Sequence, residues 1–462
     1  MADTLTLKNP VDEDPTPSPP PHNGIDLNIK TIATIILSVV SFPVLISILI
    51  LGVMFLFPMF FITIGYLVIP LGLLSTVFYS VFISSAPMSI LTVGLPLIGF
   101  FLSLAFFFSQ LNRIRFTAYL FKIVISVMFQ YPSGILVSFL SSCVSGFLSL
   151  IIFILSSIIY QNRRNIDQAD CPHENGGDVC VSNETFLYNI FILFAGYFTF
   201  EVVSNVTHAV ISGIYGSYFH FGKNGPKYPA YEAFVRAISY SFGSICFGSL
   251  LVSLISTLRS LLTIFKEKIL DELSRSREGD GDDDDDEVGN RSNSSNSLIF
   301  TLIFNILEFL IVEIENCFKI FNKYAFSYVA LYGKSYISSA KQTFNFLKYR
   351  GLQVLITKSL IESTLTVFSI LCSIFSLLGF ILMLNFLKFT FNDYPELYII
   401  GGFSQLIIGY FISKITSNSI NGGYITLLVC LSMYPDVFKA NHPKEFEQLI
   451  KFTPSLQQPL NS

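Results

Sequence analysis

The strongest constraint on the fold is a run of 82 residues, between Lys30 and Arg113, that contains no Asp, Glu, Lys or Arg. As a single helix this run would be about 120 Å long at ~1.5 Å per residue. The hydrocarbon core of a bilayer is only about 30 Å thick, so the run must cross it several times. Turn points at Pro58 and at Ala86-Pro87 predict three spans, near 31–55, 59–82 and 87–110.

The composition of the whole chain supports a membrane protein. Apolar residues make up 52% of the sequence and charged residues 13%, about half the charged fraction of a soluble domain. The net charge is -4, and eight acidic residues lie within 278–287. The remainder has no large basic surplus, so we expect the partner to be the lipid bilayer and no nucleic acid.

Further apolar stretches continue the same pattern along the chain. They predict spans near 135–160, 186–221, 238–262, from 298 onward, 363–387 and 397–432. The predicted fold class is therefore all-α, a polytopic membrane helix bundle of about nine to ten transmembrane helices.

The polar segments divide the chain into regions. We expect a disordered, Pro-rich acidic tail over 1–30 and a membrane domain over 31–435, which an acidic disordered linker interrupts at 273–297. The basic loop 111–122 and the basic segment 317–362 favour the cytoplasm. With the spans counted as above, the C-terminal tail at 436–462 is also cytoplasmic. Loops 161–185 and 263–297 then lie outside.

The loop 161–185 carries the residues that favour an outside position. Cys171 and Cys180 predict a disulfide, and Asn183 begins an Asn-x-Thr triplet that predicts a glycan. Two free thiols and a chance triplet are the alternative.

No enzyme motif is present. The five His residues are scattered without a metal-binding spacing, and there is no H-E-x-x-H or G-x-S-x-G pattern. We therefore expect no enzyme activity, no cofactor and no metal site.

Glu201 is the most informative charged residue, because it lies near the middle of the span at 186–221. Asn205 and His208 share its helical face at i+4 and i+7. This face predicts either a binding site for a cation or a structural carboxyl that is hydrogen-bonded across helices. Tyr197 and Tyr215 could add aromatic rings around an ammonium group.

A second group of charged residues lies in the span that begins near 298. Glu315 and Lys319 stand at i and i+4, in the favourable order for an ion pair, and Lys323 continues the row. This pattern is typical of a helix at the membrane–cytoplasm boundary, and a substrate vestibule is the alternative. In the span at 238–262, Gly248 and Ser249 predict close helix packing.

Four stretches carry a resemblance to a known family. They are NVTHAVISGIYGSYF at 205–219, SFGSICFGSLLVSLISTLR at 241–259, NKYAFSYVALYGKSYISSAKQTF at 322–344 and YPDVFKANHPKEFEQL at 434–449. They resemble the choline transporter-like family, and most closely its yeast and protist branch, from about Arg113 to the C-terminus. The resemblance implies a transporter of about ten helices and matches Glu201 to a family glutamate. The family's first span is missing here, so nine spans fit better.

Two functions are consistent with these observations. The first is a transporter of a small organic cation of the choline or ethanolamine class, working by alternating access in the plasma membrane or an internal membrane. The alternative is a non-transporting membrane scaffold, or a lipid-binding protein that uses the basic segment 317–362.

Overall fold

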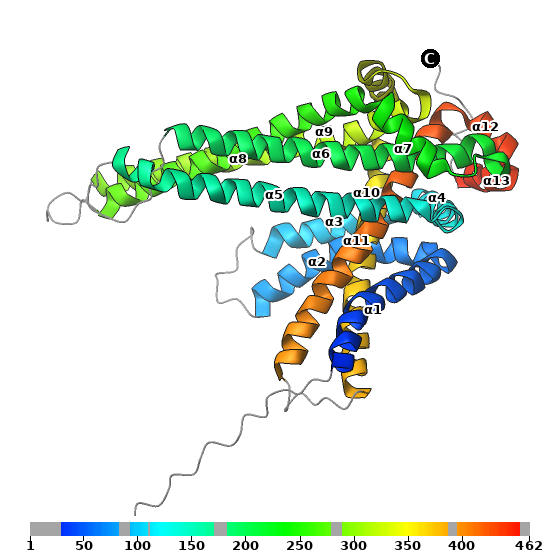
Figure 1. Ribbon diagram of the computed structural model, residues 1–462, viewed down its shortest axis with the longest axis horizontal. Helices are drawn as coiled ribbons and strands as arrows, with labels where there is room; N and C mark the ends of the chain where they lie inside the picture. The colour runs from blue at the N-terminus through cyan, green and yellow to red at the C-terminus, as the bar shows by residue number, and fades with distance from the viewer. Residues whose placement is uncertain are drawn as a thin grey trace, which may run out of the picture.

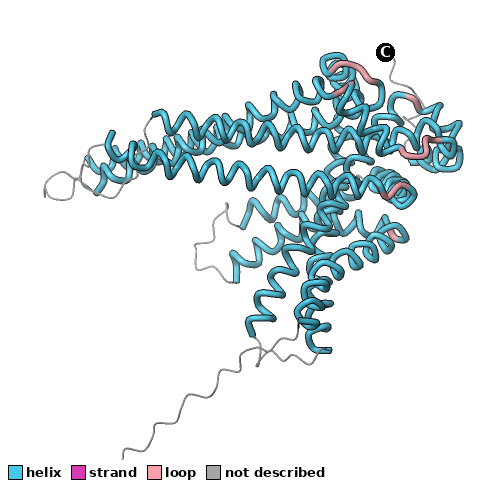
Figure 2. Tube along the Cα trace, viewed as in Figure 1, coloured by secondary structure: helices cyan, strands magenta, loops and turns pink. Residues whose placement is uncertain are grey.

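The computed structural model describes residues 29–82, 93–109, 111–170, 183–278, 289–386 and 395–452. These residues form α-helices joined by short connections, with one 3-10 turn at Gly222–Asn224 and no strand among them (Figures 1 and 2). The predicted all-α class is confirmed. Of the expected tail at 1–30, residues 1–28 lie outside the described residues, and Ile29 and Lys30 begin the first helix.

The charge-free run folds back where proline interrupts it. Helix α1 (Ile29–Leu56) ends one residue before α2 (Pro58–Phe82), so the predicted turn at Pro58 is confirmed. Proline lacks the backbone N–H that would continue the preceding helix. The second predicted turn, at Ala86-Pro87, lies outside the described residues, and α3 (Leu95–Ser109) follows it.

The basic segment after α3 is a helix, and the expectation of a loop at 111–122 is wrong. Helix α4 (Leu111–Gln130) meets α3 at an angle of 71°. It buries Ile114, Phe116 and Phe121 in the main core. These apolar side chains stabilise α4 against α1, α2, α10, α11 and α13 although Arg and Lys residues flank them.

Four long helices lie side by side and form one half of the structure (Figure 1). They are α5 (Ser133–Asp170), α6 (Asn183–Phe221), α8 (Phe242–Glu278) and α9 (Gly289–Tyr332). Helix α6 packs against the other three and also against α11. The short helix α7 (Pro229–Ser239) connects α6 with α8.

The remaining helices complete the bundle. Helices α10 (Tyr336–Phe386) and α11 (Pro395–Met433) pack on each other and on α1. Two short helices follow, α12 (Pro435–Asn441) and α13 (Pro443–Phe452). The Asn441 amide donates to the carbonyl oxygens of Phe219 and His220, at 3.1 and 2.8 Å. It thereby satisfies carbonyls that the end of α6 leaves without helical partners.

The number of membrane spans can be compared with the prediction. Within the described residues, seven helices are long and apolar enough to cross a membrane, or eight if the bent pair α3–α4 counts as one span. Helix α9 is not among them, and the described part of it carries Glu308, Glu313 and Glu315 close together. The protein is a multi-pass membrane protein, and the count of nine to ten spans remains a prediction.

Both ends of the expected linker at 273–297 are helical. Helix α8 continues to Glu278 and α9 begins at Gly289, so 279–288 of the expected linker 273–297 lies outside the described residues. Figure 1 shows the end of α8 and the start of α9 at the same end of the bundle as the end of α5 and the start of α6, opposite to α12 and α13. This arrangement agrees with the expectation that the two connections share one side of the membrane.

Small residues let the helices approach closely. A side chain added at Gly248 of α8 would place its Cβ 2.5 Å from ring atoms of Phe326 and Tyr336. The predicted packing role of Gly248 is therefore confirmed. The neighbouring Ser249 is fully buried and also takes part in a hydrogen bond, described below.

Candidate functional site

The predicted polar face of α6 is turned toward α8 and α9. The Tyr197 hydroxyl lies 2.9 Å from the hydroxyl of Ser260 on α8. The amide of Asn205 donates to Ser249 on α8 at 2.9 Å and reaches Glu201 at 3.4 Å. The stripe that sequence periodicity singled out is therefore an interhelical hydrogen-bonded face.

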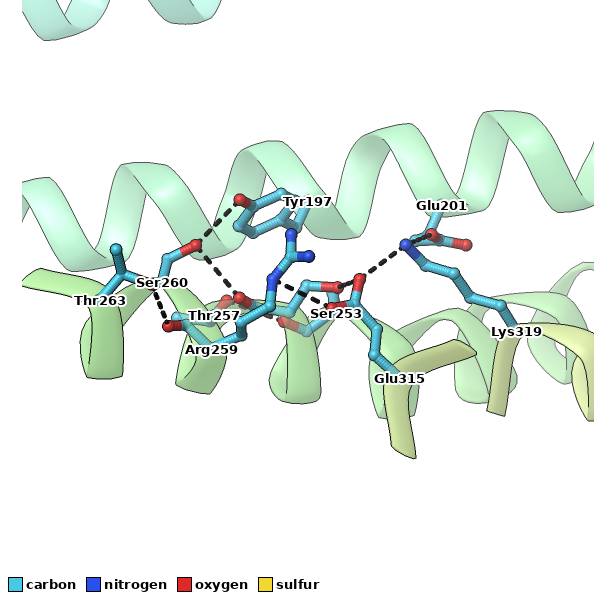
Figure 3. Close-up of polar contacts among 10 residues, drawn as sticks. Tyr197, Glu201, Ser253, Thr257, Arg259, Ser260, Thr263, Glu315 and Lys319 are labelled. Carbon is cyan, nitrogen blue, oxygen red and sulfur yellow. Dashed lines mark hydrogen bonds and ion pairs between the residues drawn. The ribbon is translucent and has the colours of Figure 1, made fainter. Parts of the chain in front are cut away.

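Glu201 lies at one end of a network of charges (Figure 3). Its side chain is 21% exposed, and its carboxylate is 3.9 Å from the ammonium of Lys319 on α9. This distance is at the limit for an ion pair. The Glu201 carboxylate therefore has only a weak ion-pair partner.

Glu315 is the most tightly held carboxylate of this network. It is 2% exposed, and Lys319 lies 2.6 Å from its carboxylate and Arg259 3.1 Å from it. The hydroxyl of Ser256 also donates to it, at 2.8 Å. The predicted pair between Glu315 and Lys319 is confirmed. The Glu315 carboxylate is enclosed between α8 and α9, and the boundary-helix interpretation remains a prediction.

His208 connects α6 with α9 and α11. Its Nε2 atom is 2.8 Å from the backbone oxygen of Lys323 and 3.0 Å from the hydroxyl of Ser327. Because a carbonyl oxygen only accepts, Nε2 donates, and in a neutral ring Nδ1 is then an acceptor. Hydrogen bonds continue from Ser327 to Ser212, at 3.2 Å, and from Ser212 to Thr426 on α11, at 2.9 Å.

Beside this face lies a polar cavity of about 460 Å³ among α5, α6, α9 and α11. On α6 its wall consists of Ser204, Thr207, His208 and Ile211. These positions follow the i, i+3, i+4, i+7 spacing of one helical face. That face adjoins the predicted one and shares His208 with it, while Glu201 and Asn205 are not part of this wall.

The opposite wall of the cavity is a row of serines on α5, at positions 138, 141, 142 and 145. These positions have the same helical spacing as the wall on α6. Helix α11 adds Asn418 and Asn421, and α9 adds Lys323. The side-chain oxygens of Ser138 and Asn421 are buried without a hydrogen-bond partner among the described residues. This side of the cavity is therefore lined mainly by polar side chains.

Sequence reasoning missed most of this cavity. The serine row on α5 has a spacing that could have been noticed, because four polar residues on one face of an apolar span are uncommon. Lys323 was placed only in a charged row, and nothing local indicated that α9 would bring it against α5 and α11.

Tyr215 is placed away from the other predicted residues. It lies fourteen residues beyond Glu201, roughly 21 Å along the helix, and is buried against Gly423 of α11. Its hydroxyl donates to the backbone oxygen of Val124 on α4 at 3.1 Å. These contacts link α6 to α4 and α11, and the structure does not bring Tyr215 and Glu201 together.

The remaining predicted sites concern the segment before α6. Cys171 and Cys180 lie outside the described residues, and Asn183 is the first residue of α6. The disulfide and the glycan remain predictions. Within the described residues, no group of three or more His, Cys, Asp or Glu side chains could hold a metal ion.

Comparisons with known proteins can now be set beside this geometry. A family model described as plasma-membrane choline transporter matches residues 94–436. A protein named PNS1 from Debaryomyces hansenii is 33% identical over 77% of this chain and 65% of its own length. The PNS1 protein of Candida albicans is 31% identical over 77% and 65%, and that of Saccharomyces cerevisiae 30% identical over 76% and 61%.

This chain thus covers less than two thirds of the length of these curated relatives. The family match itself extends from α3 to the start of α12 and includes the four helices around the cavity. The chain therefore belongs to the choline transporter-like family.

Proposed function

We propose that this protein moves a small organic ammonium compound of the choline or ethanolamine class across a membrane by alternating access. The observation that carries the proposal is the polar cavity of about 460 Å³ among α5, α6, α9 and α11. Its volume is in the range of small-molecule binding sites. The description of the family as plasma-membrane choline transporters supports the same solute class and makes the plasma membrane the first place to look for the protein.

Helix α5 is the element best suited to open and close this cavity. Ser138 at its start is buried, whereas Val144, Phe147 and Phe153 farther along are exposed. A helix that few neighbours hold can move at a low energetic cost. We propose that α5 moves relative to α6 and α11 when the cavity changes the side on which it opens.

Glu201 is proposed as the carboxylate that accompanies the ammonium group or a proton. Its distance of 3.9 Å from Lys319, with 21% of its side chain exposed, favours an exchange of partners. Glu315 is unsuited to this role, because it is buried and held by two closer cations.

The test is uptake of labelled choline and ethanolamine by proteoliposomes that contain the purified protein. Glu201→Gln should lower the initial uptake rate tenfold or more. A tenfold change corresponds to about 1.4 kcal/mol of lost interaction with the transported cation. Glu313→Gln is the matched control, because Glu313 is exposed on α9. Uptake by this variant should equal that of the wild type. Equal uptake by Glu201→Gln and wild type would remove Glu201 from the mechanism.

A lipid-binding role is the second candidate function. It is favoured by the exposed residues Lys334, Lys341 and Lys348 near the connection of α9 and α10, which could attract anionic headgroups. This function predicts no solute uptake. It also predicts binding to anionic vesicles that weakens as salt is added.

A further inference from the structure

Lys323 differs from the other cations of α8, α9 and α10 because it faces the cavity without a partner. Lys319 and Arg259 are paired with Glu315, and Lys266 with Glu308 at 2.8 Å. Within the described residues, no ion pair joins the Lys323 ammonium to an acidic side chain, and Lys323 is one of the residues that line the cavity.

Two acidic side chains act on Lys323, and each of them lies within ion-pair distance of another lysine. Glu362 on α10 and Glu201 on α6 act on Lys323 electrostatically, as do Lys358 and Lys319. Glu362 lies 3.1 Å from Lys358 and Glu201 lies 3.9 Å from Lys319. Each of these two carboxylates thus lies within ion-pair distance of another lysine, whereas Lys323 has no ion pair within the described residues.

No carboxylate belongs to the cavity wall to balance this charge. The described wall consists of hydroxyls, two amides, His208, Lys323 and apolar or glycine positions. A charged group within a membrane bundle is costly unless it is paired or solvated. The uncompensated ammonium and the serine hydroxyls around it are the groups that hold a carboxylate or a phosphate by charge-assisted hydrogen bonds.

We infer that this cavity binds the anionic group of a zwitterionic ammonium solute, with Lys323 as its counter-charge. The inference rests on the proposed transport of an ammonium compound, and it adds an anionic group to the solute that the cavity prefers. The anionic group lies against Lys323 and the hydroxyls of α5. The ammonium end lies toward Phe411, whose aromatic ring suits a cation.

A matched pair of small molecules tests the inference. Choline and glycine betaine share a trimethylammonium group, but glycine betaine has a carboxylate where choline has a hydroxymethyl group. Their dissociation constants are measured by calorimetry on the purified full chain in nanodiscs. Glycine betaine should bind about tenfold or more tightly than choline, the effect of one charged hydrogen bond. Acetate should bind much more weakly than glycine betaine, because it lacks the ammonium group.

Substitutions then assign the preference to Lys323. In Lys323→Gln the ratio of the two dissociation constants should fall to about one, while choline still binds and so reports a folded site. Lys323→Arg keeps the charge and should keep most of the preference. Lys414→Gln is the matched control, because Lys414 on α11 lies over the ring of Tyr410. Lys414 is also absent from the cavity wall, so the preference should be unchanged.

The outcomes separate this inference from the transport proposal. If proteoliposomes take up choline but glycine betaine binds no more tightly, the inference is overturned and the transport function stands. Retention of the preference in Lys323→Gln, or equal binding of acetate, would overturn it as well. If neither choline nor glycine betaine is taken up, the transport function itself fails.

Discussion

Charged residues within this bundle have different roles because their surroundings differ. Glu315 is 2% exposed and accepts from Lys319 and Ser256 while pairing with Arg259. Such a group stabilises the contact between α8 and α9, because its ionised form has several partners. Glu201, which has one distant cation and one long hydrogen bond, is less constrained. The structure therefore separates a tightly paired carboxylate, Glu315, from a weakly paired one, Glu201.

The first prediction concerns stability at Glu315. Glu315→Gln should lower the free energy of unfolding by about 1–3 kcal/mol, because charge-assisted hydrogen bonds are lost. The loss stays moderate because Arg259 and Lys319 are 35% and 40% exposed and can be hydrated. Thermal unfolding in detergent measures the effect, with exposed Glu313→Gln as the control. An unchanged unfolding midpoint in Glu315→Gln would contradict the role of Glu315.

At the scale of the helices, interhelical distance depends on particular small residues. Gly248 faces the rings of Phe326 on α9 and Tyr336 on α10, and both side chains are buried. Gly243, on the same helix, has no atom within 4 Å of the position that a Cβ would occupy. Two glycines of one helix should therefore respond differently to the same substitution.

The second prediction compares these two glycines. Gly248→Ala should destabilise the protein by about 1–3 kcal/mol, because the added methyl group overlaps rings that cannot move freely. Gly243→Ala should be neutral or stabilising by up to about 1 kcal/mol, because alanine favours the helix. The midpoints of thermal unfolding in detergent give both values. Equal effects in the two variants would be inconsistent with close packing at Gly248.

The sequence predicted the positions of the helices better than it predicted which helices pack against each other. The turn at Pro58 follows from the chemistry of proline, and the break between α4 and α5 lies at Pro132, just before the predicted span at 135–160. Helix α4 was missed because Arg113 and Arg115 suggested a loop, although the apolar residues between and after them are buried. Charge counts describe single segments, whereas burial depends on which distant helices pack against them.

At the scale of the whole molecule, the candidate site depends on four helices that are far apart in sequence. Periodicity placed Glu201, Asn205 and His208 on one polar face of the helix that became α6. Of these three residues, the structure places His208 in the cavity wall. It could not show that Ser204 and Thr207 face the cavity while Glu201 faces α9. That distinction depends on which faces of α6 contact α5, α9 and α11. These contacts cannot be deduced from a single sequence.

The most direct test of the transport function is to fill the cavity and measure uptake. Ser141→Phe would place a ring in the cavity from α5. Leu150→Phe adds a ring to the opposite face of the same helix, where Leu150 is 61% exposed. The account predicts that Ser141→Phe abolishes uptake of labelled choline-class solute into proteoliposomes without changing the unfolding midpoint, and that Leu150→Phe transports like the wild type. Undiminished uptake by a folded Ser141→Phe protein would contradict the account.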